Sequence, residues 1–283
     1  MQKSTKSKPF NSHEFKKSLG QNFISDKNLL TAIVGDAEIS STDMVVEIGA
    51  GAGTLTEVIA SKCKKLISFE VDESLKEDLA KIEDEHKNLK VVFKDFLKVE
   101  RDELLQLFED GENVKSIKVI ANIPYYITTP IVFKLLNWCG LVKDISIMVQ
   151  KEVGERMVSV PNSKTYGALS AVVNYYGKAT IKRVVKKQNF YPMPKVDSCI
   201  VNIKVRENID ENYAIGVSKF IQSCFFNRRK TLCNNLMSAL SITRESAESA
   251  LNQLSLNAKV RAEELSSEQF ELLYKVLSGY KTK

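Results

Sequence analysis

The sequence predicts an α/β protein with a doubly wound, Rossmann-like sheet and a small, all-helical C-terminal domain. From Met44 onward, short runs rich in Val and Ile alternate with amphipathic stretches. Consecutive apolar residues are typical of parallel strands buried on both faces, and apolar residues three or four apart are typical of covering helices. Beyond Arg206 the strand pattern stops and helical patterns take over. This order of elements predicts a doubly wound sheet followed by a helical domain.

Five strand–helix pairs make up the first part of this prediction. In order they are MVVEIGA and TLTEVIASKC, KLISFEVD and SLKEDLAKIEDEH, LKVVFKDFL and DELLQLFED, SIKVIANIP and PIVFKLLNW, and DISIMVQ and KEVGERMVS. A helix, TYGALSAVVNYYG, comes next. The two runs after it, ATIKRVVK and DSCIVNIKV, flank the Pro-rich turn FYPMPK. We expect these two runs to form an antiparallel pair at the edge of the sheet.

The C-terminal part reads as helical throughout. Its stretches are YAIGVSKFIQSCFFNRRKTLCNNLMSAL, ITRESAESALNQLSL and SSEQFELLYKVLSG. Thr243, and either Ser266 or Ser267, are expected N-caps because acidic residues follow them in the first turn. We therefore expect a flexible basic arm over residues 1–14, a doubly wound domain over 15–206 and a helical domain over 207–283.

Composition excludes several classes of protein. The chain has 283 residues, 43% of them hydrophobic, and no run approaches the roughly 18 apolar residues of a membrane helix. The N-terminus, MQKSTKSKPF, lacks the apolar segment of a secretory signal, so we expect a cytoplasmic protein with no membrane partner. Five cysteines without a C-x-x-C pair and two histidines predict neither a disulfide framework nor a metal site. The cysteines, expected to be reduced core residues, are Cys63, Cys139, Cys199, Cys224 and Cys233.

Positive charge is gathered in short runs, although the net charge is only +6. For any single run the favoured interpretation is a solvated surface. Three runs together favour a polyphosphate partner, that is, a nucleic acid. The runs are Lys3, Lys6, Lys8, Lys16 and Lys17; Lys182, Arg183, Lys186 and Lys187; and Arg228, Arg229 and Lys230.

A glycine-rich turn follows the first predicted strand of the sheet. Gly49, Gly51 and Gly53 alternate with alanines, and Thr54 occupies the third glycine position of the dinucleotide fingerprint. This departure argues against a nicotinamide dinucleotide. A G-x-G-x-G turn preceded by an acid matches the amino-acid end of S-adenosylmethionine better.

Acids end the next two strands of the pattern. Glu70 ends the second strand, where a carboxylate can accept hydrogen bonds from both ribose hydroxyls. Asp95 ends the third and can accept from an adenine amine, with Phe96 packing nearby. Alone, each acid reads more readily as an exposed strand-end residue. Together with the glycine turn, the two acids favour a nucleoside-binding crevice.

The fourth strand ends in Asn122-Ile123-Pro124-Tyr125. An adenine or amide nitrogen is a poor nucleophile because its lone pair is delocalised, so a transferase must offer acceptors that draw the amine out of plane. The Asn122 side-chain oxygen and the carbonyl of Ile123 or Pro124 suit this role, and Tyr125 can stack on the base. An ordinary turn after a strand is the alternative. The place of the motif in the fourth strand favours the reaction site.

Five stretches, read in order, closely resemble the ribosomal RNA adenine dimethyltransferases. They are Gly20-Gln21-Asn22-Phe23, VEIGAGAGTLT, FEVD, NIPYYITTPI and FYPMPKVDS. The resemblance runs from about Phe15 to the end of the helical domain. It implies a class I methyltransferase sheet, S-adenosylmethionine as cofactor and transfer to the exocyclic amine of adenosines.

The resemblance also implies roles for single residues. The Q-N-F segment helps to cover the cofactor, and the phenylalanine that heads the F-x-P-x-P-K turn sandwiches a flipped adenine opposite the motif tyrosine. Without the resemblance, that phenylalanine reads as a loop or core residue. The implied cofactor residues are Asn22, Ile24, Gly49, Gly51, Glu70, Asp95 and Asn122. The implied residues at the reacting base are Asn122, Pro124, Tyr125 and Phe190.

Within the family, the run FFNRRKTL followed by Asn234-Asn235-Leu236 resembles the housekeeping branch that modifies small-subunit RNA. This implies dimethylation of two adjacent adenosines near the 3′ end of 16S rRNA, in the small subunit or its precursor. We expect the protein to be a monomer. Arg228, Arg229 and Lys230 are then expected to bind the RNA. Two departures stand out: Ala50 replaces a common proline, which is expected to loosen the turn, and Ile123 replaces a common leucine.

Three alternatives remain open from the sequence. One is a 23S rRNA dimethyltransferase that confers antibiotic resistance, with a similar catalytic domain. Another is a non-catalytic assembly or transcription factor that keeps the fold for RNA or DNA binding, against which the intact Asn122 and Tyr125 argue. The third is a small-molecule or protein N-methyltransferase, which the clustered cations and the helical domain disfavour.

Overall fold

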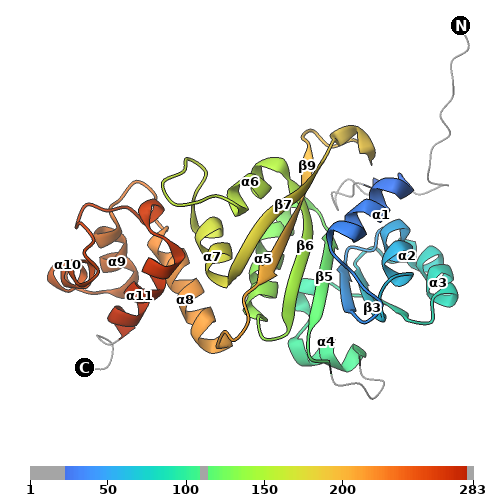
Figure 1. Ribbon diagram of the computed structural model, residues 1–283, viewed down its shortest axis with the longest axis horizontal. Coiled ribbons are helices and arrows are strands. Elements are labelled where there is room, and N and C mark those ends of the chain that lie inside the picture. The colour runs from blue at the N-terminus through green and yellow to red at the C-terminus, as the bar shows by residue number, and fades with distance from the viewer. Residues whose placement is uncertain (1–22, 109–113, 279–283) are drawn as a thin grey trace, which may run out of the picture.

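The computed structural model describes residues 23–108 and 114–278 (Figure 1). Its strands are β1 Phe23–Ile24, β2 Met44–Ile48, β3 Lys65–Glu70, β4 Leu89–Phe93, β5 Ile117–Asn122, β6 Val142–Gln150, β7 Gly177–Val185, β8 Phe190–Tyr191 and β9 Ser198–Val205. Its helices are α1 Lys27–Asp36, α2 Thr54–Ala60, α3 Lys76–Glu85, α4 Arg101–Phe108, α5 Thr128–Asn137, α6 Lys151–Met157, α7 Ala168–Tyr176, α8 Glu211–Cys224, α9 Leu232–Leu240, α10 Arg244–Gln253 and α11 Ser267–Ser278.

The main sheet confirms the predicted doubly wound architecture. Its strand order is β4-β3-β2-β5-β6-β9-β7. The strands from β4 to β6 run parallel, and β9 is antiparallel to both β6 and β7. The expected antiparallel pair is therefore β7 and β9, with β7 at the edge. A second, two-stranded sheet pairs β1 with β8, which the sequence pattern did not predict.

Each central strand contributes to two hydrophobic clusters because side chains alternate across a sheet. On one face Val45 and Ile120 join the apolar side chains of α1, α2 and α3. On the other face Val46 and Ala121 join those of α4, α5 and α7. Figure 1 shows α1, α2 and α3 on one side of the sheet and α5 and α7 on the other. Both faces are covered, which explains the unbroken Val and Ile runs.

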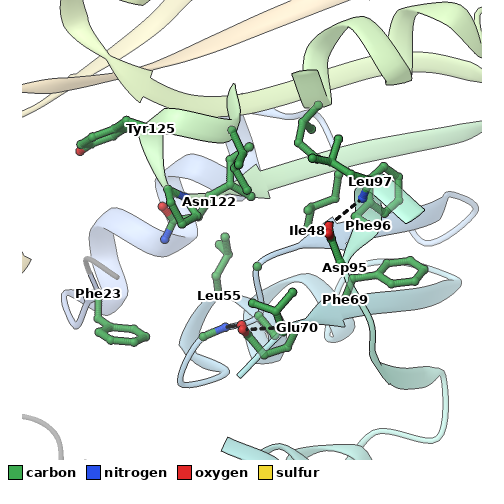
Figure 2. Close-up of a pocket in the computed structure, with 18 of the residues that line it drawn as sticks. Phe23, Ile48, Leu55, Phe69, Glu70, Asp95, Phe96, Leu97, Asn122 and Tyr125 are labelled. Carbon is green, nitrogen blue, oxygen red and sulfur yellow. Dashed lines mark hydrogen bonds between the residues drawn. The ribbon is translucent and has the colours of Figure 1, made fainter. Parts of the chain in front are cut away.

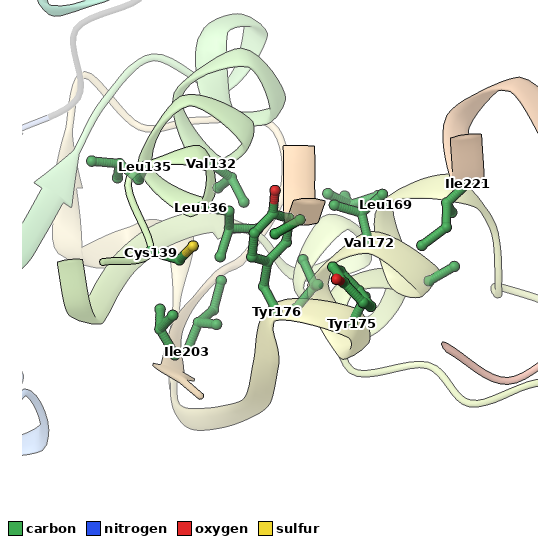
Figure 3. Packing of buried hydrophobic residues seen from close by; sticks show 14 of the residues in the cluster. Val132, Leu135, Leu136, Cys139, Leu169, Val172, Tyr175, Tyr176, Ile203 and Ile221 are labelled. Atoms are coloured by element: carbon green, nitrogen blue, oxygen red, sulfur yellow. The ribbon is translucent and has the colours of Figure 1, made fainter. Parts of the chain in front are cut away.

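The C-terminal helices share the second of these clusters. Ile221 of α8 packs with Leu169 and Val172 of α7, next to side chains of α5 (Figure 3). The Tyr176 hydroxyl of α7 donates a hydrogen bond of 3.0 Å to Asn137 Oδ1 of α5. Strands end at Val205 and helices follow from Glu211 in the described residues, as the pattern predicted, yet one hydrophobic cluster continues across this change.

The first C-terminal helical stretch, residues 213–240, is divided into two helices. α8 ends at Cys224 and α9 begins at Leu232. The turn between them, residues 225–231, is held by the buried side chain of Asn235. Its amide donates to the carbonyls of Cys224 at 2.9 Å and Asn227 at 3.2 Å. Thr231 then caps α9 by accepting from the Asn234 N–H at 3.4 Å.

Two of the expected N-caps are confirmed. Thr243 Oγ1 accepts from the Ser246 N–H at 3.2 Å, at the start of α10. Of the two serines, Ser266 caps α11, because its Oγ accepts from the Gln269 N–H at 3.3 Å. None of the helices within residues 23–108 and 114–278 combines the length and apolar character needed to span a bilayer.

Candidate active site

A cavity of about 430 Å³ opens at the carboxyl edge of the parallel strands (Figure 2). Residues at the ends of β2, β3, β4 and β5 line it, so the strand-end residues predicted from the sequence meet there. Among the predicted site residues, those that line the cavity are Ile24, Gly49, Gly51, Glu70, Asp95, Asn122, Pro124 and Tyr125. Asn22 lies outside the described residues.

The glycine turn is shaped by contacts that only glycine permits. Gly49 has φ +86°, and a Cβ on it would lie 2.6 Å from the carbonyl oxygen of Asn122. Gly51 has φ +56°, and a Cβ on it would lie 2.8 Å from the Phe23 ring. Residues with a side chain rarely adopt these backbone conformations, and the space that a Cβ would need is already occupied by Asn122 and Phe23. The turn therefore runs directly beside the Asn122 backbone, which joins the predicted cofactor site to the predicted reaction motif.

Ala50 gives this turn a backbone hydrogen bond, and the expected loosening relative to proline stays a prediction. The N–H groups of Gly49 and Ala50 both donate to the carbonyl of Phe69, at 2.8 Å and 3.2 Å. Proline has no N–H and would lose the second of these bonds.

The segment before α1 covers the glycine turn from the other side. Phe23 and Ile24 line the cavity, and the Ile24 carbonyl accepts a 3.1 Å hydrogen bond from Thr54 Oγ1. Thr54 is the residue that breaks the dinucleotide fingerprint. It fixes the covering segment to the start of α2, a role that the sequence pattern did not reveal.

Glu70 binds the backbone around the cavity with both of its oxygens. Its Oε2 accepts from the Gly51 N–H at 2.7 Å, and its Oε1 accepts from the N–H groups of Val71 and Asp72 at 2.8 and 2.9 Å. The side chain is 6% exposed. A carboxylate offers about four lone-pair positions, so these three bonds leave one for a further donor.

Asp95 keeps one carboxylate oxygen available to the cavity. Its Oδ1 accepts from the Leu97 N–H at 2.9 Å, and no hydrogen bond from the described part of the chain reaches its Oδ2. Phe96 is buried beside it, with its ring edge-on to Phe69 at a centroid distance of 5.2 Å.

Val71 is a cavity-lining residue that the sequence reasoning missed, although it directly follows Glu70. Its side chain is half exposed.

The Asn122 side chain is free to bind a ligand. It is partly buried, lines the cavity, and makes no hydrogen bond to any described residue. Figure 2 shows it between Tyr125 and Phe23. Pro124 follows in an extended conformation, and its carbonyl already accepts a 3.2 Å hydrogen bond from the Ile127 N–H.

Tyr125 is fixed by a residue that the sequence reasoning did not single out. Its hydroxyl lies 2.7 Å from Ser198 Oγ, a buried side chain at the start of β9. Burial raises the pKa of the Tyr125 phenol above its usual value, so the ring stays neutral. Ser198 is the last residue of the FYPMPKVDS stretch, and that motif was the available signal.

Phe190, the expected partner of Tyr125 in a base sandwich, is buried in this structure, and the sandwich itself stays a prediction. Its side chain is 5% exposed and belongs to the hydrophobic cluster that contains Leu30 and Ile200, and it does not line the cavity. β8 pairs with β1, which places Phe190 opposite Ile24, a residue that lines the cavity. The interpretation of Phe190 as a core residue, made without the resemblance, describes this position.

The cationic runs differ in how far acids neutralise them. In the run from Lys182 to Lys187, ion pairs join Lys182 to Glu38, Arg183 to Asp36 and Lys186 to Asp197, at 3.4, 2.7 and 2.9 Å. In the run Arg228, Arg229 and Lys230, all three residues are exposed, and none forms an ion pair with a described residue. The first run, Lys3 to Lys17, lies outside the described residues. Of the two runs that the structure describes, the run at 228–230 is the one in which no cation forms an ion pair with a described residue.

The cysteines are buried and free, as expected for core residues. Burial raises the pKa of the Cys63 thiol to about 12, which disfavours the nucleophilic thiolate. Within the described residues, no group of three His, Cys, Asp or Glu side chains gathers in a form suited to a metal ion.

Glu47, behind the glycine turn, is a buried acid that the sequence reasoning used only as part of the motif. Its Oε2 accepts from Thr56 Oγ1 at 2.7 Å and Ser68 Oγ at 2.6 Å, and its Oε1 is buried without a partner in the described chain. Burial, together with the charge of Glu70, raises the pKa of Glu47 to about 7, against the lowering effect of the two hydroxyls.

We predict that Glu47 makes stability depend on pH. The folded chain holds this proton more tightly than the unfolded chain, so the contribution of Glu47 is greatest below about pH 4.5 and is lost as pH rises to about 7. Glu47→Gln removes the titration. The melting temperature of Glu47→Gln minus that of the parent should therefore become more positive between about pH 5 and pH 8. Glu57→Gln, at a partly exposed acid of α2, is the control; a Glu47→Gln difference that stays constant with pH would contradict the assignment.

Comparison with known proteins places the whole chain among rRNA-modifying enzymes. A family model described as ribosomal RNA adenine dimethylase matches residues 12–278. Ribosomal RNA small subunit methyltransferase A of Bacillus pumilus (strain SAFR-032) is 40% identical over 272 residues, which cover 93% of this chain and 91% of that protein. The protein of the same name from Clostridium acetobutylicum is 42% identical over 261 residues, covering 90% and 91%.

Solved structures agree with the fold. A dimethyladenosine transferase from Plasmodium falciparum superposes with a TM-score of 0.74 and 26% identity, covering 92% of this chain and 98% of that one. The 23S rRNA methyltransferase ErmE superposes with a TM-score of 0.65 at 23% identity, covering 90% and 99%, which is a likeness of fold.

Proposed function

The chain belongs to the ribosomal RNA adenine dimethylase family, and from that membership we propose that it methylates N6 of two adjacent adenosines near the 3′ end of 16S rRNA. The methyl donor is S-adenosylmethionine, the product is N6,N6-dimethyladenosine, and the reaction takes place during small-subunit biogenesis. The observation that carries the proposal is the cavity in which the glycine turn, two strand-end acids and the unpaired Asn122 amide meet.

The residues at the carboxyl edge fit S-adenosylmethionine. Gly49 and Gly51 leave a strip of backbone that a Cβ would fill. The remaining acceptor position of Glu70 suits a ribose hydroxyl, and Oδ2 of Asp95 suits the adenine amine. Val71 and Phe96 offer apolar contacts to a purine ring. When bound, the cofactor supplies an electrophilic methyl group on a sulfonium centre.

Asn122 is the residue that prepares the target nitrogen. Its side-chain oxygen accepts from the N6 amine and favours the geometry in which the nitrogen lone pair leaves the ring π-system. Because Gly49 lies against the Asn122 carbonyl, the acceptor is held beside the cofactor turn. The charge that develops on nitrogen is stabilised by these acceptors, and the proton is lost afterwards to solvent.

Tyr125 provides the stacking surface for the target base, and the hydrogen bond to Ser198 fixes the angle of its ring. Phe190 is the proposed second half of the sandwich, and it packs with Leu30, a residue that itself lines the cavity.

The free Asn122 amide favours an enzyme over a factor that only binds nucleic acid. The small-subunit names of the relatives at 40–42% identity favour 16S over 23S rRNA. We propose further that the protein acts as a monomer in the cytoplasm, where ribosomal subunits assemble.

The decisive experiment is mass spectrometry of rRNA from small subunits that lack dimethyladenosine, before and after incubation with the protein and S-adenosylmethionine. The expected result is two dimethyladenosines per 16S rRNA. Methylation of 23S rRNA in large subunits, with none in small subunits, would support the 23S alternative, and no methylation of either would favour the binding factor.

The three unpaired cations at 228–230 give a prediction about RNA affinity. Replacement of Arg228, Arg229 and Lys230 by Ala should weaken binding and reduce the slope of log K against log salt by up to about 0.9 for each phosphate that the variant no longer neutralises. The matched control is Lys182→Ala with Lys186→Ala, because those lysines already pair with acids. The slopes are measured by titration of small subunits over a range of salt. If the slope of the triple variant stays unchanged while transfer falls, the run has a structural role instead.

A further inference from the structure

The turn between α8 and α9 presents an aromatic ring to solvent. Phe226 is 81% exposed, whereas its neighbour Phe225 is 8% exposed and packs in the core. An exposed phenylalanine forgoes the stabilisation that burial provides, and it has no polar atom to hydrate. No other described large apolar side chain is as exposed.

The turn that carries Phe226 is ordered by internal hydrogen bonds. The Asn235 amide donates to the carbonyls on both sides of the two phenylalanines, at Cys224 and Asn227, and its oxygen accepts from the Asn227 N–H at 3.2 Å. The Phe226 N–H donates to the Ser223 carbonyl at 3.2 Å. Because the backbone is fixed on both sides, the ring is presented at little cost in conformational entropy.

The charged side chains that follow this ring in the turn have one sign. Arg228, Arg229 and Lys230 are exposed, carry no ion pair with a described residue, and stand within four positions of Phe226. No acid lies between Phe226 and Thr231. A rigid aromatic ring beside unneutralised cations matches a nucleic acid strand, because bases offer π-faces and phosphates offer negative charge at short spacing.

The turn is connected to the carboxyl edge of the sheet through α6. That helix begins at Lys151, where β6 ends, and β6 is the neighbour of the strand that ends at Asn122. The loop after α6 reaches the turn, since Arg228 Nη2 donates to the Tyr166 carbonyl at 3.3 Å. Figure 1 shows α6 between the sheet and the C-terminal helices.

We propose that Phe226 is a base-stacking residue that holds an unpaired nucleotide of the substrate RNA, away from the target adenosine. The cations at 228–230 bind the phosphates on either side of that nucleotide. The proposal rests on RNA being the substrate, and it adds that the RNA has an extruded or single-stranded base at a second position. A protein partner is disfavoured, because the three cations beside the ring have no acid within the turn to offset them.

The test uses a 12-nucleotide oligoadenylate and an abasic ribose-phosphate strand of the same length. Phe226→Ala should raise the Kd for oligoadenylate about tenfold, within the range that alanine substitution gives for base–aromatic stacking, and leave the Kd for the abasic strand unchanged. The salt dependence of binding should not change, because no charge is removed. Phe226→Trp should restore affinity. Its added indole fluorescence, measured against the single Trp of the parent, should be quenched by oligoadenylate but not by the abasic strand.

Leu272→Ala is the matched control, since Leu272 is 51% exposed on α11 beside an acid, Glu271. It should bind both strands as the parent does. The proposal is overturned if Phe226→Ala binds oligoadenylate like the parent, if it loses affinity for both strands equally, or if the indole at 226 is not quenched. Methyl transfer to unmethylated small subunits is measured in parallel with the parent chain. If the parent chain transfers no methyl group, the proposed function is refuted. The stacking proposal is judged separately, from the affinities for the two strands and the indole quenching.

Discussion

Asn122→Ala should lose methyl transfer by about 10²- to 10³-fold while keeping near-normal affinity for cofactor and RNA. This is the scale observed when one preorganised hydrogen bond to a transition state is removed. The Asn122 side chain has no partner in the described chain, so its loss breaks no internal bond. Transfer of the second methyl group should suffer at least as much, because monomethylation removes one donor and positioning then depends more on the remaining contact.

Single-turnover assays with labelled cofactor, resolving monomethyl from dimethyl product, measure this effect. Asn252→Ala, at an exposed asparagine of α10, controls for the loss of an amide elsewhere and should transfer at the parent rate. If Asn122→Ala transfers both methyl groups at the parent rate, the N-I-P-Y segment is only a strand-ending turn and the catalytic assignment fails.

Glu70→Ala should weaken binding of S-adenosylmethionine by about 1.5 to 3 kcal/mol, the usual scale for hydrogen bonds to a charged group. Two causes contribute, because Glu70 has an acceptor position left for the ribose and also holds the Gly51 N–H of the glycine turn. Calorimetry gives the affinity. Glu73→Ala, an exposed acid three positions along, removes the same charge and should bind like the parent.

A double-mutant cycle separates the two causes. S-adenosylhomocysteine and its 2′-deoxy analogue are each titrated into the parent and into Glu70→Ala. If Glu70 binds the ribose, the deoxy analogue should bind the parent more weakly, and this difference should shrink in Glu70→Ala. An unchanged difference would show that Glu70 acts only by shaping the turn, and an unchanged affinity for the cofactor in a folded variant would remove Glu70 from the site.

The strand-end residues that line the cavity were predictable because their information is local. A strand buried on both faces is recognisable from its own Val and Ile residues, and parallel strands bring their carboxyl ends to one edge. Gly49, Glu70, Asp95 and Asn122 therefore had to meet once the strands were identified. The backbone bonds that occupy Glu70 were not predictable, because they depend on the path of the loops that follow β2 and β3.

The surroundings of Tyr125 and Phe190 depended on long-range pairing. Ser198 lies 73 positions after Tyr125 in the chain. It reaches the tyrosine only because β9 lies beside β6. Phe190 is buried because β8 pairs with a two-residue strand at the N-terminal end of the described chain. The resemblance to a family supplied a role for Phe190, but strand pairing decided where its side chain lies.

The sequence by itself determined the order of strands and helices from Met44 through the main sheet, the glycine turn and the acids at the strand ends, because these follow from local periodicity and from where each run stops. Only the tertiary structure decided which charges and rings remain available. Lys182 and Arg228 belong to equally basic runs, yet acids distant in sequence neutralise the first, while the second stays unpaired beside an exposed Phe226. Burial and ion pairing are properties of neighbours in space, and the chain acquires those neighbours only when it folds.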